Sequence, residues 1–124
     1  MTLLKSVLLV ASGGALGALA RYVVTVFTTA QGVAPWGTFI VNILGCFLIG
    51  ILIAQASGSE WYQAYGRSLI VVGFLGAFTT FSAFSLDTLE LAEQGKTSMA
   101  IIYAAITVSS CLAATYTGLK LAIN

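Results

Sequence analysis

Histidine is absent from this chain of 124 residues, and charged residues make up only 7% of it. Without histidine the chain lacks the commonest metal ligand and the commonest general base. A nucleophile activated by histidine is therefore excluded, and we expect no enzymatic activity. A soluble domain carries about a quarter charged residues, so the composition predicts an integral membrane protein. The net charge of +1 without a basic run also argues against nucleic acid as a partner.

Cysteine and proline are scarce as well, with two cysteines and one proline in the whole chain. Cys46 and Cys111 both lie within apolar runs. That setting is typical of small packing residues and disfavours a disulfide framework or a zinc site.

Four apolar segments are long enough to cross a bilayer, which takes roughly 20 mostly apolar residues per helix. They cover residues 3–29, 37–56, 67–91 and 98–123. Trp36 and Trp61 lie at the short breaks between segments, where interfacial aromatic residues belong. The sequence predicts an all-α integral membrane protein with one four-helix domain spanning residues 1–124 and both termini on the same side.

The third segment is unusual in its centre. Between Gly73 and Ser85 it carries several hydroxyl groups that hydrocarbon cannot satisfy. Phe78, Phe81 and Phe84 recur at a spacing of three, which places them along one side of a helix. The paired threonines 79 and 80 mark the expected break of this helix in mid-membrane, which survives only if protein buries it or water reaches it. The alternative is a continuous helix whose hydroxyls bond back to their own carbonyls.

Polar residues also interrupt the other segments. Arg21 either extends to an interface or lines a polar site. Asn42 offers two donors and one acceptor, for a ligand or for an interhelical hydrogen bond. Tyr103, Thr107 and Ser110 share one face of the last segment, as contacts between helices or as a hydrated track.

The charge distribution bears on orientation. Lysine and arginine number three on one side (Lys5, Arg67, Lys120) and two on the other (Arg21, Lys96). The positive-inside signal is therefore nearly absent, so we expect insertion in both orientations and an antiparallel homodimer. The alternative is that the weak bias still selects one orientation.

The polar inventory favours a pathway for a small anion. Neutral amide and hydroxyl donors, together with the positive edges of aromatic rings, can replace part of its hydration without trapping it. Carbonyl oxygens freed by a helix break would suit a hard cation such as Na⁺. The alternative function is a small dual-topology, proton-coupled drug exporter, in which Asp87 would have to carry the proton.

Three motifs carry a resemblance to a known family. They are Gly73-Phe74-Leu75-Gly76 followed by Thr79-Thr80-Phe81-Ser82-Ala83-Phe84-Ser85, then Gly37-Thr38-Phe39-Ile40-Val41-Asn42, and Gly13-Gly14-Ala15-Leu16-Gly17 before Arg21-Tyr22. Across essentially the whole chain the sequence resembles the Fluc/CrcB family of fluoride channels. The resemblance implies an antiparallel, dual-topology homodimer with two pores in the bacterial inner membrane. It also implies passive export of fluoride from the cytoplasm, with strong selectivity over chloride.

The resemblance assigns roles to individual residues of this chain. By it, Phe81 and Phe84 match pore phenylalanines, Asn42 a pore asparagine and Arg21 a vestibule arginine. The carbonyls of Gly76 and Thr79 match ligands of a structural Na⁺ at the dimer interface. Polar groups beside the pore are matched by Thr80, Ser82, Tyr103, Thr107 and Asp87. The chain departs from the family at Cys111, a position often held by a hydroxyl residue, and at Ala77, which is often glycine.

Overall fold

The computed structural model describes residues 2–32, 35–56 and 58–123, and this part of the chain is helical without a strand. The elements are α1 (Leu3–Ala30), α2 (Trp36–Ala56), the π-helix η1 (Tyr62–Leu75), α3 (Gly76–Phe78), α4 (Phe81–Glu93) and α5 (Thr97–Ile123). Within these residues four spans are long and apolar enough to cross a membrane: α1, α2, the composite span Tyr62–Glu93, and α5. The four-helix prediction is confirmed.

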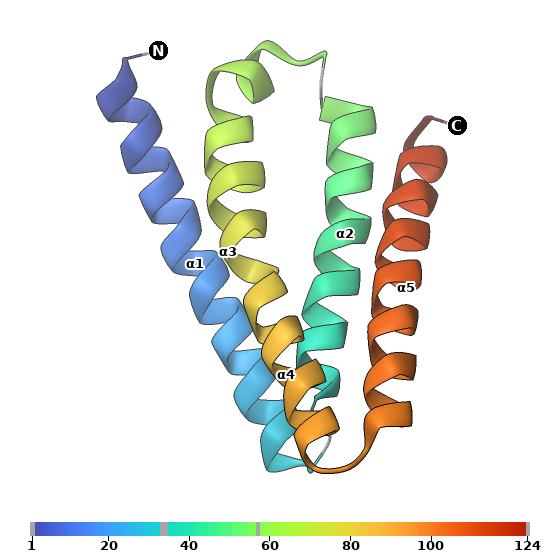
Figure 1. The fold of residues 1–124 in the computed structure, drawn as a ribbon. Helices are drawn as coiled ribbons and strands as arrows, with labels where there is room; N and C mark the ends of the chain where they lie inside the picture. Colours follow the sequence, from blue (N-terminus) through green and yellow to red (C-terminus); the bar gives the residue numbers. More distant parts are fainter. Residues whose placement is uncertain (1, 33–34, 57, 124) are drawn as a thin grey trace.

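The spans run up and down in chain order (Figure 1). Both termini and the connection from α2 to η1 lie at one end of the bundle, while the α1–α2 and α4–α5 connections lie at the other. This is the arrangement expected from four consecutive crossings.

Glycines set how closely the spans pack. α1 packs chiefly against η1, and Gly13 and Gly17 of α1 lie directly against the backbone carbonyls of Leu69 and Phe74. Small residues at this interval let two helix backbones approach closely. The glycine pattern of the first span therefore has a packing role.

A second glycine contact joins α2 to α5, which also pack extensively against each other. Gly50 and Gly118 face each other here, and a Cβ on Gly118 would lie 3.2 Å from the Gly50 Cα. The molecule is thus built from two closely packed helix pairs, α1 with η1 and α2 with α5.

The third span begins earlier than the sequence suggested. We expected it from Arg67, but η1 starts at Tyr62. The Tyr62 side chain is only 2% exposed, and a Cβ on Gly66 would lie 2.7 Å from the Trp61 ring and 3.0 Å from that of Tyr62. The rings of Trp61 and Tyr62 cover Gly66, so residues 62–66, which the sequence prediction left outside the third span, form its first turn.

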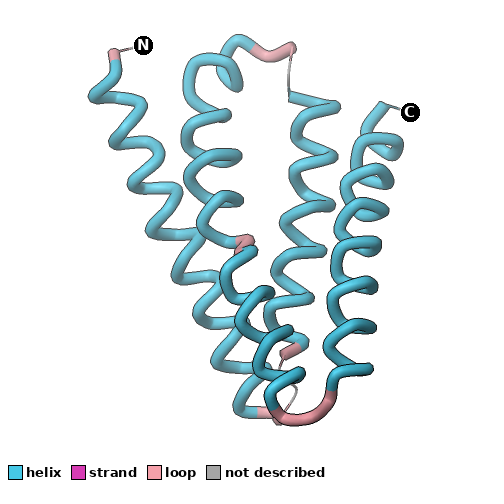
Figure 2. The backbone as a smooth tube through the Cα atoms, in the orientation of Figure 1, coloured by secondary structure: helices cyan, strands magenta, loops and turns pink. Residues whose placement is uncertain are grey.

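The same span is broken at its centre. Thr79 (φ −81°, ψ 157°) and Thr80 (φ −153°, ψ 119°) are both extended, and they separate α3 from α4. Figure 2 shows this short non-helical stretch in the middle of the span, far from both ends of the bundle. The predicted break is confirmed, and the continuous helix is not what forms.

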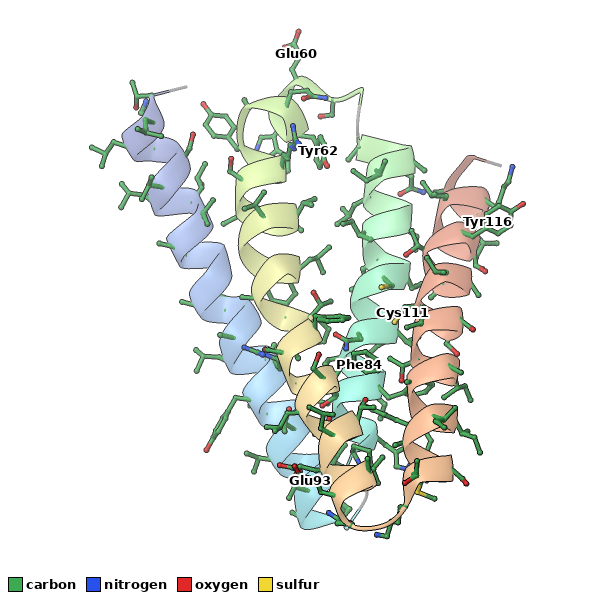
Figure 3. The ribbon with its side chains drawn as sticks, in the orientation of Figure 1. Glu60, Tyr62, Phe84, Glu93, Cys111 and Tyr116 are labelled. Atoms are coloured by element: carbon green, nitrogen blue, oxygen red, sulfur yellow. The ribbon has the colours of Figure 1, made fainter. Side chains whose placement is uncertain are left out.

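The outer surface is apolar. Large aliphatic side chains on it are between 60% and 68% exposed: Leu16, Leu19, Val23, Ile101 and Leu112. The charged residues Glu60 and Glu93 lie at opposite ends of the bundle (Figure 3). Such a distribution suits hydrocarbon around the middle of the bundle and water at its two ends.

Candidate functional site

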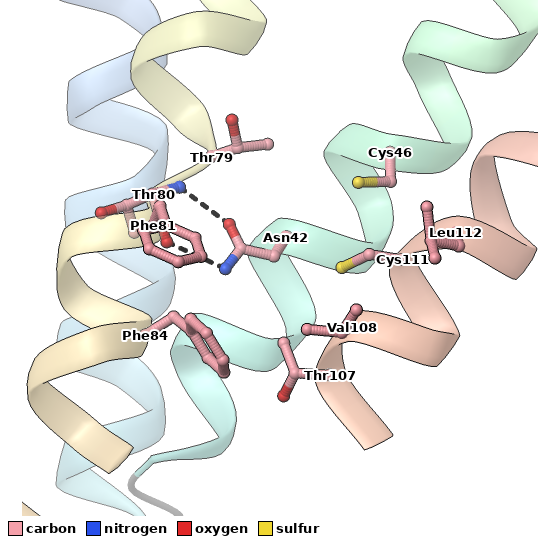
Figure 4. Close-up of a pocket in the computed structure, with 10 residues that line it drawn as sticks. All are labelled: Asn42, Cys46, Thr79, Thr80, Phe81, Phe84, Thr107, Val108, Cys111 and Leu112. Atoms are coloured by element: carbon pink, nitrogen blue, oxygen red, sulfur yellow. Dashed lines mark hydrogen bonds between the residues drawn. The ribbon is translucent and has the colours of Figure 1, made fainter. Parts of the chain in front are cut away.

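A side chain from α2 compensates for the broken backbone. The Thr80 amide donates to Asn42 Oδ1 at 2.7 Å, and Asn42 Nδ2 donates to the Thr80 carbonyl at 3.0 Å (Figure 4). Asn42 is 8% exposed, so both bonds form where an unpaired backbone group would be costly. The amide has a second Nδ2 hydrogen, which these two bonds do not use.

The side chain of Thr80 starts the next helix. Its hydroxyl accepts a hydrogen bond from the Ala83 amide at 3.1 Å, which is an N-cap on α4. The same hydroxyl lies 3.0 Å from Ser82 Oγ. Thr80 and Ser82 therefore act first as local structure at the start of α4.

These bonds redirect two amides that an unbroken helix would use internally. In such a helix the Thr80 amide would donate to the Gly76 carbonyl and the Ala83 amide to the Thr79 carbonyl. Here those amides donate to Asn42 Oδ1 and Thr80 Oγ1 instead. The two carbonyls deprived of their helical donors are those predicted to bind Na⁺. Backbone carbonyl oxygens are suitable ligands for a hard cation, so the residues present fit such an ion.

Aromatic rings form a row that leads inward from the break. The ring centroids of Phe81 and Phe84 are 5.3 Å apart, and Phe84 lies 5.7 Å from Tyr103. Phe81 is 76% exposed, whereas Phe84 is 8% and Tyr103 2% exposed. The row thus runs from the outer face of the chain to its interior.

Phe78 does not belong to this row, and its predicted alignment with Phe81 and Phe84 is wrong. Its ring stacks on Phe74 of η1 instead, with centroids 5.8 Å apart. The extended residues at 79 and 80 interrupt the helical phase, so a spacing of three across them no longer puts side chains on one face.

A cavity of about 290 Å³ lies where the break, the phenylalanines and α5 meet. Its lining is uncharged: Asn42, Cys46, Thr79, Thr80, Phe81, Phe84, Thr107, Val108, Cys111 and Leu112. Figure 4 shows these side chains converging from three spans. We refer to it as the central pocket.

Thr107 lines the central pocket with a side chain that is only 3% exposed. Its Oγ1 is buried and has no hydrogen bond of normal geometry to any described residue, although the Tyr103 hydroxyl lies near enough to interact with it. Figure 4 shows this oxygen turned away from Asn42. A buried hydroxyl without a well-formed hydrogen bond is costly, so a small change of its rotamer toward a ligand or water would cost little.

Tyr103 connects the central pocket to an acidic residue. Its hydroxyl lies 3.4 Å from Asp87 Oδ2 and 3.5 Å from the Pro35 carbonyl, both long for hydrogen bonds from a hydroxyl. Asp87 therefore faces the interior of the bundle. The sequence alone left its direction open.

Arg21 lies in a separate cavity of about 370 Å³, which we call the lateral cavity. Its lining is Ala18, Arg21, Tyr22, Thr25, Thr38, Thr80, Ala83 and Asp87. Arg21 is half-buried and forms no ion pair with Asp87 within the described part of the chain. Arg21 thus lines a cavity that also contains polar side chains, and its role as a vestibule residue stays a prediction. Thr80 borders both cavities and so lies between them.

The structure thus gathers five of the predicted pathway residues in the central pocket: Asn42, Thr80, Phe81, Phe84 and Thr107. Tyr103 contacts this group through the Phe84 ring. Ser82 is exposed, does not line the pocket, and contacts Thr80, which does. Arg21 belongs to the lateral cavity.

Cys46 and Cys111, which the sequence analysis interpreted as packing residues, also belong to the pocket wall, together with Val108 and Leu112. For Cys111 the resemblance had already marked a position often held by a hydroxyl residue. A signal was present, because Cys46 follows Asn42 by four residues and Cys111 follows Thr107 by four. Residues four apart share a helix face, so each cysteine extends a polar face already identified.

Comparison with known proteins finds relatives that match nearly the full length of the chain. The family described as "CrcB-like protein, Camphor Resistance (CrcB)" matches residues 8–119. Among curated relatives, a fluoride-specific ion channel FluC from Rhizobium etli is 44% identical over 116 residues, covering 92% of this chain and 93% of the relative. The protein of the same name from Magnetococcus marinus is 44% identical over 112 residues, covering 89% and 91%. That from Geobacter sulfurreducens is 37% identical over 121 residues, covering 96% and 98%.

Proposed function

The chain belongs to the CrcB family, and from this premise we propose that it is a fluoride-selective ion channel that exports fluoride passively from the cytoplasm. It is an ion channel and not an enzyme, and it crosses the membrane several times. The observation that carries the proposal is the central pocket, which offers hydrogen-bond donors and ring edges but no charge.

The chemistry of the central pocket suits an anion that must leave again. An idealised ion entering a low-dielectric medium loses about 20 kcal/mol of solvation. The free Nδ2 hydrogen of Asn42, the Thr107 hydroxyl and the positive edges of Phe81 and Phe84 can each offset part of that loss. None carries a full charge, so a dehydrated fluoride is stabilised without being held too tightly to conduct.

The lateral cavity supplies the approach. Arg21 gives it a fixed positive charge, which raises the local concentration of anions. The Asp87 carboxylate partly offsets that charge; it lies 3.4 Å from the Tyr103 hydroxyl and does not line the central pocket. Thr80, which borders both cavities, lies where an anion would pass from one to the other.

The same proposal includes a second copy of the chain, inserted in the opposite orientation. Phe81 lines the central pocket yet is 76% exposed, and Leu112 on the opposite wall is 68% exposed. A single copy therefore leaves the pocket open at its side. Two opposed copies would close two such pockets, and the nearly even lysine and arginine count permits both orientations. The proposed location is the bacterial inner membrane.

A structural Na⁺ is part of this dimer proposal. The carbonyls of Gly76 and Thr79, which have lost their helical amide donors, would hold it. Gly76 is exposed in the single chain, so a second copy could reach it. The ion would supply positive charge that fastens the two broken helices together.

Efflux from vesicles tests the proposed function. Protein reconstituted into liposomes loaded with potassium fluoride should release fluoride to an electrode once valinomycin carries the potassium, without any proton gradient. Liposomes loaded with potassium chloride are the matched control. Flux of chloride equal to that of fluoride, or no fluoride flux, would overturn the proposal.

The variant Phe81→Ile sharpens the test. We expect it to abolish fluoride flux, because an aliphatic side chain has no positive edge to present to the anion. Its elution on size exclusion should match that of the unaltered protein. Normal flux through Phe81→Ile would remove this ring from the pathway.

The alternative raised by the sequence, proton-coupled export of cationic drugs, is tested in the same vesicles. It requires dye efflux driven by a pH gradient and lost in Asp87→Asn. We expect no such efflux. Asp87 is the carboxylate that would have to carry the proton, and it lies beside Tyr103, outside the central pocket.

A further inference from the structure

Two thiols lie together on the wall of the central pocket. Cys46 comes from α2 and Cys111 from α5, and both are free and half-buried. Both line the pocket, and the two groups are close enough to interact directly. Figure 4 shows the two sulfur atoms turned to the same side, toward Asn42 and the break.

The backbone holds these thiols in a defined relation. They belong to α2 and α5, whose close contact through Gly50 and Gly118 limits relative movement. Each cysteine follows a polar pocket residue by one turn, Cys46 after Asn42 and Cys111 after Thr107. The pair is therefore a built feature of the pocket wall, accessible from the space through which an anion would pass.

We propose that Cys46 and Cys111 form a binding site for one soft cation of linear, two-coordinate preference, with Hg²⁺ as the probe. Thiolates are soft ligands that select soft cations. Among the described residues no group of three or more histidine, cysteine, aspartate or glutamate side chains surrounds the pair. A cation that needs four protein ligands, such as structural zinc, therefore does not fit, whereas one satisfied by two sulfurs does.

The binding reaction balances without any further reactant. One Hg²⁺ and two thiols give a neutral Hg(SR)₂ unit and release two protons, and two sulfur–mercury bonds replace two sulfur–hydrogen bonds. Proton release is the usual companion of thiolate ligation. The neutral product suits a pocket within the membrane, where a net charge would be costly.

Occupation of this site should also block conduction, a consequence that rests on the proposed function. The metal would lie beside Asn42 and Thr107 in a cavity of only about 290 Å³. It would narrow the space through which fluoride passes. Fluoride flux should therefore fall when Hg²⁺ is added and recover when excess dithiothreitol removes the metal.

Titration of the purified protein tests the site independently of transport. Binding of Hg²⁺ is followed by the ultraviolet absorption of the mercury–thiolate bond, in the presence of glutathione as a competing monothiol. We expect one Hg²⁺ per chain for the unaltered protein. Cys46→Ser and Cys111→Ser should each bind roughly 100-fold more weakly, because the second thiol of a preformed pair binds intramolecularly.

A matched control separates the pair from the mere number of thiols. Ser109→Cys in the Cys46→Ser background restores two thiols per chain, but residue 109 is exposed on α5 and does not line the pocket. This double variant should not regain tight binding. Equal affinity of the unaltered protein and the single-cysteine variants, or recovery in the Ser109→Cys control, would overturn the proposal.

Fluoride flux is then measured with and without Hg²⁺, each variant being compared with its own untreated rate. Block in the unaltered protein and resistance in both serine variants support the proposal, whereas equal block in all of them contradicts it. Absence of fluoride flux before any metal is added would instead count against the proposed function. The absorbance titration still decides the metal site in that case.

Discussion

Asn42 shows how one side chain links stability to function at the scale of a single residue. Its carboxamide oxygen replaces the helical partner of the Thr80 amide, and its Nδ2 donates to the Thr80 carbonyl. The break can therefore exist at membrane depth without an unpaired amide at that residue. The residue predicted to face an anion is thus also the residue that pairs with the broken backbone.

We expect Asn42→Ala to destabilise the protein by about 1–3 kcal/mol, because it leaves the buried amide of Thr80 without its partner and removes a donor to the Thr80 carbonyl. The free energy of unfolding in mixed micelles, titrated with a denaturing detergent, measures this. Ile53→Ala on the same helix is the control, since Ile53 is 42% exposed. Equal stability of the two variants would show that the pairing with Thr80 contributes nothing.

At the scale of the element, the third span has to make two different contacts, one with α1 and one with α5. Its η1 half must approach α1 closely, and glycines on both helices allow this. Its α4 half must turn Phe84 toward α5, and the break after α3 allows that change of phase. A helix of uniform geometry would satisfy one demand or the other.

We expect Gly13→Ala to destabilise the α1–η1 contact by about 1–3 kcal/mol, the usual cost of overpacking. Its Cβ would overlap the Leu69 carbonyl and lie 2.9 Å from the Phe74 amide. Gly14→Ala is the neighbouring control, because its Cβ would lie 3.9 Å from the nearest neighbour, the Gly73 carbonyl. Unfolding in mixed micelles compares the two, and a loss in Gly14→Ala as large as in Gly13→Ala would contradict this account.

At the scale of the whole molecule, the balance of lysine and arginine between the two ends bears on assembly. Gln31 is exposed at one end of the bundle and Gly58 is exposed at the other. A Cβ on Gly58 meets nothing within 4 Å, so a lysine fits there without disturbing the fold. Each position can therefore carry an added positive charge that biases orientation.

We expect Gly58→Lys to favour one orientation, with four lysines and arginines at the end of the termini against two. Gln31→Lys combined with Lys5→Gln should favour the other, with two against three. Each variant alone should lose most fluoride efflux from cells, because it lacks an opposed partner. Co-expression of the two should restore efflux. Accessibility of a carboxyl-terminal reporter on each side of the membrane is the accompanying measurement. Full activity of either variant in one orientation would contradict the antiparallel dimer.

The sequence by itself determined the four spans, the shared side of the termini and the position of the break. These depend on local quantities, namely the length of apolar runs and the density of hydroxyls around residues 79 and 80. The sequence did not predict the start of the third span, because the burial of Tyr62 depends on tertiary contacts that a short stretch of sequence does not show.

Only the tertiary structure decided which faces of the helices meet. The pairing of Asn42 with Thr80 and the meeting of Cys46 with Cys111 both depend on contacts between separate spans. Helical periodicity places residues on a face, but it does not say what that face touches. The close glycine contacts within the two helix pairs determine which faces meet, and therefore which polar groups share the central pocket.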